Sequence, residues 1–378
     1  MIICINIERN TKDQMDQLIR SGEYRDYSEL AAIAVGNQLL LHSTEENGLA
    51  PHSEPISLND SPRKEPVTPS GESKNDIRED EVTPPKRPEV LGIPQIFQLA
   101  ANRNVPNTFA PLPNDAFAAG MEVTVDRWIF GQHNKLLPAK ASVRALANLL
   151  RSESSQGGLS LERASTEIAA AAVGLGDLLR RLDSSTQRPR DESFGVAFPS
   201  SDPANSDKSR LRYGSQFVGA ISREGRMTGL LIDLKLINHD RYKSPRIQLT
   251  EQGWQLAELP NPILDGPQNE SGSRFSPDET ELLIAHIASS VPAEDFAYKA
   301  TLSAITDGYD TPERLDAALK KYLPDRKAKP FTDAFLTTQR AGVISRMADL
   351  GLVARVRNGP NVTYIATARG KQFTEKGR

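Results

Sequence analysis

The alternation of hydrophobic and polar residues is clearest near the C-terminal end of the chain. Apolar residues recur at intervals close to 3.6 along residues 332–350, which predicts a helix. They are Phe335, Leu336, Val343, Met347 and Leu350. Gly351 should end this helix, because glycine tolerates the left-handed geometry of a helix C-terminus. Two β-rich runs follow, 352–357 and 362–366, with turn-forming residues at 358–361. The pattern therefore predicts a helix, a tight stop and a β-hairpin.

The same pattern occurs a second time upstream. The run 231–237 matches 347–353, and the run 247–253 matches 364–370. The matched Asp233 and Asp349 are 116 positions apart and the matched Gly253 and Gly370 are 117 apart, so the spacing is kept within one residue. Two copies of one supersecondary unit make each of them more credible.

Helix, stop and hairpin in this order, followed by Leu-Thr-x-x-Gly at 249–253, resemble the second half of winged helix-turn-helix domains. The resemblance is to the superfamily. It implies that the threonine caps the next helix and that each unit places a helix in the major groove of DNA. It also implies that the hairpin arginines contact phosphate or the adjacent minor groove. The alternative interpretation of the C-terminal copy is an αββ unit with a solvated basic face.

The N-terminal residues predict a different module. Ile3, Ile5 and Ile7 alternate with polar residues, as in a half-buried strand. A helix that ends at Gly22 follows, and a second helix begins at the N-cap Ser28. Strand, helix, turn and capped helix, above all SGEYRDYSELAAIAVGNQLL, resemble the ribbon-helix-helix family. The resemblance implies a homodimer in which two copies of the N-terminal strand pair into a ribbon.

In that family the ribbon enters the major groove, which implies that Cys4, Asn6 and Glu8 face the bases and that Ser28 lies at a phosphate. Glu8 is acidic where the family often carries Arg or Lys. Residues 1–43 hold four basic against six acidic side chains, a balance poorly suited to phosphate. The ribbon therefore either contacts DNA or only dimerises the protein.

Composition divides the chain into five segments, and the predicted fold class is mainly α with small β-hairpins (α+β). The segments are a ribbon-helix-helix module (1–43), a disordered acidic Pro/Ser-rich linker (44–93), a first winged-helix domain (94–264) with a polar loop (184–209), a connector (265–275) and a second winged-helix domain (276–378). Helices are predicted at 141–150, 162–182 and 296–305, and Ser276 and Thr311 should cap two more.

The distribution of charge singles out the two winged units. The whole chain has a net charge of -3, but residues 325–378 carry eleven basic against four acidic side chains, and residues 208–246 carry nine against three. Segments with such a surplus of positive charge can attract the phosphate backbone of a nucleic acid. The predicted DNA-binding residues are Asn6, Glu8, Ser28, Arg241, Lys243, Arg246, Arg340, Arg346, Arg355, Arg357 and Asn358.

Other classes of function find little support in the sequence. A single cysteine, Cys4, excludes a disulfide or a Cys-based metal site within one chain, and the five histidines lack metal-ligand spacing. No catalytic or cofactor motif emerges, and His133 is interpreted as structural. Without a signal peptide or a long apolar run, the chain is expected to be cytoplasmic, with no membrane contact.

The sequence thus predicts a dimeric protein that binds double-stranded DNA sequence-specifically, a prokaryotic transcriptional regulator rather than an enzyme. The alternative is a non-enzymatic adaptor or assembly protein of a DNA-segregation or genome-defence complex. In that case the winged helices would contact a protein partner.

Overall fold

The computed structural model describes residues 16, 92–101, 108–113, 122–152, 158–202, 206–223, 225–240, 245–266, 273–325, 331–359 and 361–375. The chain divides into two units, Met1–Pro84 and Pro85–Arg378, and the fold described here is that of the second. The predicted N-terminal strand and helices, except for residue 16, lie outside the described residues, and so does the linker up to residue 91.

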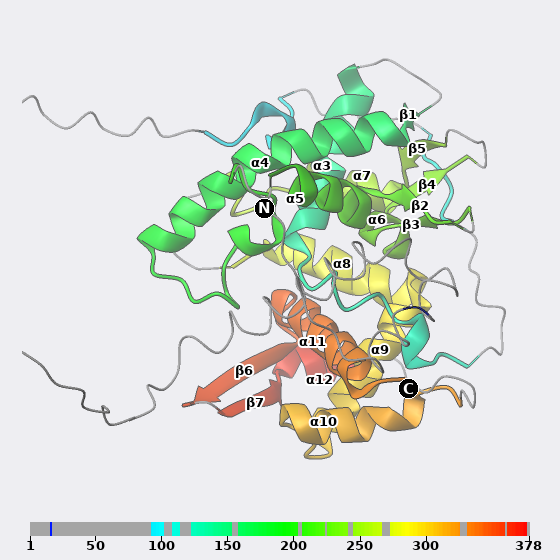
Figure 1. The fold of residues 1–378 in the computed structure, drawn as a ribbon, viewed down its shortest axis with the longest axis vertical. Helices are drawn as coiled ribbons and strands as arrows, with labels where there is room; N and C mark the ends of the chain where they lie inside the picture. Colours follow the sequence, from blue (N-terminus) through cyan, green and yellow to red (C-terminus); the bar gives the residue numbers. More distant parts are fainter. Residues whose placement is uncertain are drawn as a thin grey trace, which may run out of the picture. The chain divides into compact units, whose positions relative to one another are not determined.

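The first half of this unit is helical, with short strands toward its end (Figure 1). Its elements are η1 (Gln95–Phe97), η2 (Val125–Arg127), α3 (Leu137–Ser152), β1 (Leu159–Ser160), α4 (Leu161–Ser185), η3 (Gly195–Ala197), α5 (Ser206–Tyr213), the π-helix η4 (Gly214–Val218), β2 (Ala220–Ile221), β3 (Met227–Thr228), α6 (Leu230–Asp233), β4 (Ile237–His239), β5 (Arg246–Leu249) and α7 (Glu251–Glu258). Strands β1, β5 and β4 form an antiparallel sheet in that order, and β2 pairs with β3.

The second half contains α8 (Pro277–Ser290), α9 (Pro292–Thr306), α10 (Pro312–Leu319), η5 (Lys320–Tyr322), α11 (Asp333–Asp349), β6 (Val353–Asn358), β7 (Asn361–Ala366) and α12 (Ala368–Glu375). Helix α8 begins with the predicted capping box, in which the Ser276 hydroxyl accepts from the Glu279 N–H and the Glu279 carboxylate accepts from the Ser276 N–H. The hairpin β6–β7 lies beside α11 and α12 (Figure 1). The described unit is therefore mainly helical with small antiparallel sheets, the coarse fold class that the sequence predicts.

The predicted internal match is visible in the hydrogen bonds that end each helix. The N–H of Leu236 donates to the carbonyl of Leu231 at 2.9 Å, and the N–H of Leu352 donates to that of Met347 at 2.9 Å. The residue before each of these leucines has a positive φ, 54° for a lysine in the first half and 68° for Gly351 in the second. Both helices thus stop by one left-handed residue, which is easy for glycine and strained for lysine.

The threonine after each hairpin also plays the same part twice. The hydroxyl of Thr250 accepts from the N–H of Gly253 at 3.2 Å, and that of Thr367 accepts from the N–H of Gly370 at 3.0 Å. Each hydroxyl also donates to the carbonyl of the leucine that follows the helix stop, at 3.1 Å in both halves. One hydroxyl therefore ties the cap of the last helix to the end of the preceding one.

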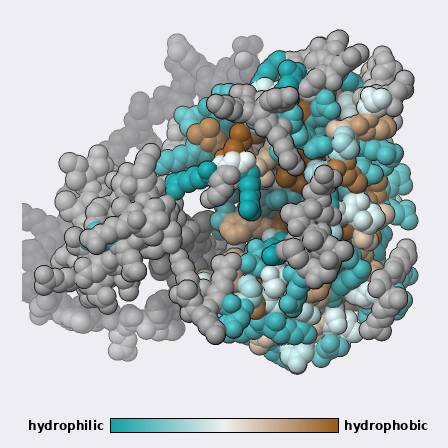
Figure 2. All heavy atoms as spheres, turned by 90° about the vertical axis from the view of Figure 1, so that its right-hand side faces the viewer, coloured by the Kyte–Doolittle hydropathy of each residue, from teal (hydrophilic) through white to brown (hydrophobic). Residues whose placement is uncertain are grey.

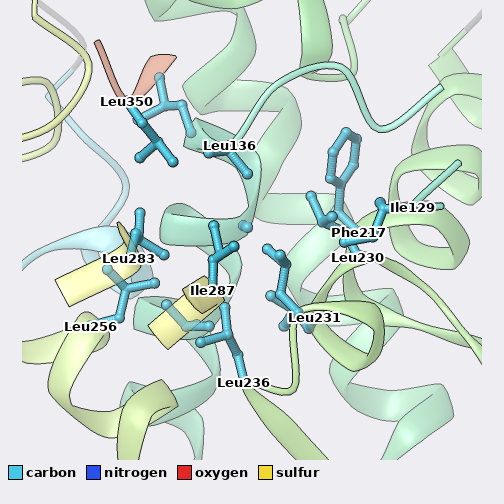
Figure 3. Packing of buried hydrophobic residues seen from close by; sticks show 14 of the residues in the cluster. Ile129, Leu136, Phe217, Leu230, Leu231, Leu236, Leu256, Leu283, Ile287 and Leu350 are labelled. Atoms are coloured by element: carbon cyan, nitrogen blue, oxygen red, sulfur yellow. The ribbon is translucent and has the colours of Figure 1, made fainter. Parts of the chain in front are cut away.

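The two halves share one hydrophobic core. Figure 3 shows Leu136 of the first half beside Leu350 of the second, and Leu256 beside Leu283. The predicted connector at 265–275 therefore joins two halves of one compact unit and does not separate two independent cores.

Ion pairs are buried in the same region. Lys140 on α3 and Glu279 on α8 are both fully buried, with 2.8 Å between Nζ and Oε1. Arg346 on α11 pairs with Glu294 on α9, and both of these side chains are fully buried as well. Removing one partner of such a pair leaves an uncompensated charge, so both pairs fix the helices they join, and the Lys140–Glu279 pair joins the two halves.

Candidate nucleic-acid interface

Helix α5 carries a basic exposed surface in the first half. Lys208, Arg210 and Arg212 are all exposed, and Tyr213 at the end of the helix is buried. Lys208, Leu211 and Arg212 are spaced as neighbours on one helix face, and Leu211 is 71% exposed. A face that combines cations with one exposed leucine can contact phosphates and the methyl group of thymine.

The cations of α5 are weakly engaged by other side chains. Arg210 pairs with Asp207 at 3.0 Å, but both side chains are largely exposed, and such pairs contribute little. The Nε of Arg212 donates to the Gln216 side chain at 3.3 Å. These guanidinium groups can therefore turn toward an external anion at small cost.

A second group of cations lies on the hairpin that follows. Arg223 and Arg226 are exposed in the turn between β2 and β3, and β2 packs against η4, the continuation of α5. The face of the molecule in Figure 2 mixes hydrophilic residues with small separate hydrophobic groups among its described residues. The predicted DNA-binding residues between 208 and 246 are Arg241, Lys243 and Arg246. The cations of α5 and of the β2–β3 turn are not among them, because exposure on α5 depends on how that helix packs.

The C-terminal hairpin has two chemically different faces. Arg355 and Arg357 share one face, since they alternate along β6 and pair across the strands with Tyr364 and Val362. Val356 on β6 and Ile365 on β7 are exposed large hydrophobic residues. The predicted basic character of the hairpin is thus confined to one of its faces.

Both hairpin arginines contact an acidic side chain from a distant part of the chain. The Asp191 carboxylate lies 2.8 Å from Nη2 of Arg357 and 3.8 Å from Nη1 of Arg355. Asn358, at the hairpin tip, is exposed. Arg357 and Asn358 are therefore exposed, and Arg355 is half-buried, with 22% of its side chain exposed.

Two predicted DNA contacts on α11 lie inside the protein, and this corrects the prediction for them. Arg346 is fully buried against Glu294 and also donates to the carbonyl of His133 at 2.8 Å. Arg340 is buried too, with its Nε 2.7 Å from Asp316 and one Nη 2.9 Å from the Tyr364 hydroxyl. Because α11 is buried along most of its length, neither guanidinium can reach phosphate in this arrangement.

The remaining predicted contacts divide into two groups. Arg246 is exposed on β5, and its Nε donates to the Gly158 carbonyl at 3.1 Å. The other predicted contacts lie outside the described residues: Asn6, Glu8, Ser28, Arg241 and Lys243. The structure brings Arg355, Arg357 and Asn358 together on one hairpin, and it adds the α5 surface, which the sequence list omits.

Several buried groups have altered protonation. Burial, then the charges of Arg346 and Arg212, lower the pKa of His133 from 6.5 to about 4, so its ring is neutral near neutral pH. Burial raises the pKa of Asp233 from 3.8 to about 6, partly offset by the nearby Arg346. Among the described residues, no His, Cys, Asp and Glu side chains are grouped so that they could hold a metal ion.

Comparisons with protein-family models, with curated proteins and with solved structures found no match to this chain. None of the helices in the described ranges has both the length and the apolar character needed to cross a membrane.

Proposed function

We propose that this protein binds double-stranded DNA through exposed basic surfaces and acts as a dimeric, sequence-specific transcriptional regulator. The observation that carries the proposal is the exposed basic surface of α5, with Lys208, Arg210 and Arg212 within five residues. Lys208 and Arg212 lie four residues apart on one face, and cations in this density on a short helix suit the regularly spaced phosphates of a duplex.

The C-terminal hairpin supports the same proposal. Arg355 and Arg357 lie on one face of β6 and can together approach a backbone phosphate. Helix α11 has no such part here, because its arginines are buried. The duplex would therefore be contacted by α5 and by the hairpin rather than by the helix that precedes the hairpin.

Dimer formation is proposed from the sequence of residues 1–43, which resembles a ribbon-helix-helix module. Two copies of every basic surface would then bind one duplex, and linked weak sites gain affinity through effective concentration. Replacing Ile5 with Asp places a charge on the face that the dimer would bury. Sedimentation of the full chain should then shift from dimer to monomer, and a monomeric wild-type protein would refute this part.

The DNA-binding proposal is tested with a pair of doubly substituted proteins. Fluorescence anisotropy with a labelled random-sequence duplex compares Lys208→Ala/Arg212→Ala with wild type. The slope of log K against log salt should fall by roughly 2, since each phosphate contact contributes about 0.9. The control, Arg314→Ala/Lys320→Ala, removes the same charge from exposed ion pairs on α10 and η5.

Two results would count against DNA binding. One is a wild-type protein that does not bind the duplex even at low salt. The other is an equal loss of affinity in the α5 variant and in the control, which would make the effect one of net charge alone.

One observation favours a second candidate, a non-enzymatic adaptor or assembly protein. The uncharged face of the C-terminal hairpin exposes Val356 and Ile365, and exposed apolar side chains on a sheet suit a protein partner. In that case wild-type protein would not bind random duplex, and Val356→Ser/Ile365→Ser would weaken its association with a partner that co-purifies.

A further inference from the structure

The Asp191 carboxylate occupies the space between the two hairpin arginines. It lies 2.8 Å from Arg357 and 3.8 Å from Arg355, although 164 residues separate Asp191 from the nearer of them in sequence. A carboxylate and a phosphate present the same kind of anionic oxygens to a guanidinium group. Asp191 therefore stands where a phosphate would stand if the hairpin bound DNA.

Asp191 is placed there by its neighbours and not by its own side chain. The buried carboxylate of Asp183 accepts from the N–H groups of Phe194 and Gly195, at 3.0 and 2.9 Å, and from the Ser193 hydroxyl at 2.6 Å. These bonds fold residues 183–195 into a fixed loop at the end of α4. The polar loop predicted from the sequence is thus ordered at this point.

Two cations from other elements hold the backbone of the same loop. Nζ of Lys135 donates to the Asp191 carbonyl at 2.7 Å, and an Nη of Arg274 donates to the Glu192 carbonyl at 2.6 Å. Both bonds end on main-chain oxygens. Changing the Asp191 side chain would therefore leave the anchors of the loop in place.

The surroundings of Asp191 carry more positive than negative charge. Lys135, Arg274, Arg355 and Arg357 face the carboxylates of Asp191 and Asp349. Asp349 is buried and is already engaged, since it pairs with Arg274 at 3.2 Å and accepts from the Leu136 N–H at 3.0 Å.

The charged groups of this cluster also affect the pKa of Lys135. Burial has the largest effect and lowers the pKa of Lys135 to about 8; the charges of Asp349 and Asp191 raise this pKa, and those of Arg274 and Arg355 lower it. In addition, the Nε of Arg355 is buried and has no hydrogen-bond partner. The cluster can therefore accept an anion with more charge and more oxygens than one carboxylate offers.

We propose that Arg355 and Arg357 form a binding site for a DNA backbone phosphate, and that Asp191 occupies this site in the DNA-free protein. The inference rests on the proposed DNA binding and adds a regulation to it. Because the Arg357 side chain is 59% exposed, its pair with Asp191 is weak and a phosphate can displace the carboxylate. The hairpin then binds DNA only after it has released Asp191.

Asp191→Asn tests this directly, because the amide keeps the size of the side chain and removes its charge. We expect duplex affinity to rise roughly three- to tenfold, and the salt slope to steepen by about 1 as an additional phosphate contact forms. The control Asp307→Asn removes one exposed carboxylate at the end of α9. It should leave the salt slope unchanged.

A triple variant shows whether the gain in duplex affinity comes from the release of Arg355 and Arg357 or from a remote effect. In an Arg355→Ala/Arg357→Ala background, Asp191→Asn should give no gain, because the arginines that it frees are absent. A gain that persists in this background would overturn the proposal, and so would equal slopes for Asp191→Asn and wild type. Thermal unfolding of each variant reports whether the fold is kept.

The outcomes separate this inference from the proposed function. If wild type binds the duplex and Asp191→Asn does not change the affinity, DNA binding is supported and the proposed occupation of the phosphate site by Asp191 is refuted. Binding by both proteins, tighter and with a steeper salt slope for Asp191→Asn, would support both. If neither protein binds duplex, both proposals are refuted.

Discussion

Arg346 and Glu294 form a bidentate ion pair inside the protein, with Nε 2.5 Å from Oε1 and Nη2 3.0 Å from Oε2. The same guanidinium donates to the carbonyls of His133 and Ile129, which precede α3. One side chain therefore joins α11, α9 and the loop that leads into α3. This is why the helix expected to read DNA is fixed within the core.

Breaking this pair should destabilise the whole unit. Glu294→Gln keeps the shape of the side chain but leaves the charge of Arg346 buried and uncompensated, so the free energy of unfolding should fall by about 3–5 kcal/mol. Urea denaturation measures it. The matched control is Glu167→Gln, which removes an exposed partner of Arg163 and should cost less than about 0.5 kcal/mol. Similar losses for the two variants would contradict the structural role of the pair.

Gly253 and Gly370 each lie close to the backbone carbonyl of a leucine, and substitution can test this contact in both halves. A Cβ at Gly253 would lie 2.1 Å from the Leu236 carbonyl oxygen, and a Cβ at Gly370 would lie 2.2 Å from that of Leu352. Because each clash is with backbone, alanine should destabilise each half by about 1–3 kcal/mol.

Gly174 in α4 is the control for these two glycines. A Cβ there would meet nothing closer than Pro94 at 3.6 Å, so Gly174→Ala should gain up to about 1 kcal/mol from helix propensity. Stability is read from thermal unfolding. Stabilisation by alanine at Gly253 or Gly370 would mean that the contact with the preceding leucine is not tight.

His133 and Asp233 should give opposite pH dependences of stability. The folded-state pKa of His133 is about 4, below its usual 6.5, so its contribution to stability is lost as pH falls from 6.5 to 4. The folded-state pKa of Asp233 is about 6, above its usual 3.8, so its contribution is lost as pH rises from 3.8 to 6. The two effects oppose each other between about pH 4 and 6.

Asp233→Asn removes one of these effects. The variant should lose more stability than wild type when pH falls from 6 to 4, because only the His133 effect remains. Urea midpoints at several pH values measure this, with Asp307→Asn as the control for the loss of a carboxylate. Parallel curves for Asp233→Asn and wild type would show that Asp233 titrates alike in the folded and unfolded states.

The fixed conformation of the loop that carries Asp191 should depend on the carboxylate of Asp183. In Asp183→Asn the amide group cannot accept all the N–H and hydroxyl groups that the carboxylate accepts, and each buried donor left unpaired costs about 1–3 kcal/mol. Hydrogen exchange at the amides of Phe194 and Gly195 should therefore speed up. Asp177→Asn, on the same helix but partly exposed, should leave exchange at those two amides unchanged.

The sequence was informative wherever a structure depends on neighbours in the chain. The cap at Ser276, the stop at Gly351 and the hairpin after it follow from residues within a few positions of one another, and each is present. The internal match of two units was also readable, because it lies in the order of residue types. The same local rules misjudged Arg340 and Arg346, which look like surface cations on a helix.

By itself the sequence determined the local elements, the mainly helical class and the two basic regions, because propensity, capping and charge are properties of short segments. Only the tertiary structure decided which cations face outward. Burial depends on partners far along the chain: Glu294 takes Arg346 out of solvent, and Asp191 comes to lie against Arg355 and Arg357. The packing of distant segments therefore selects, among many arginines, the few that remain available to a ligand.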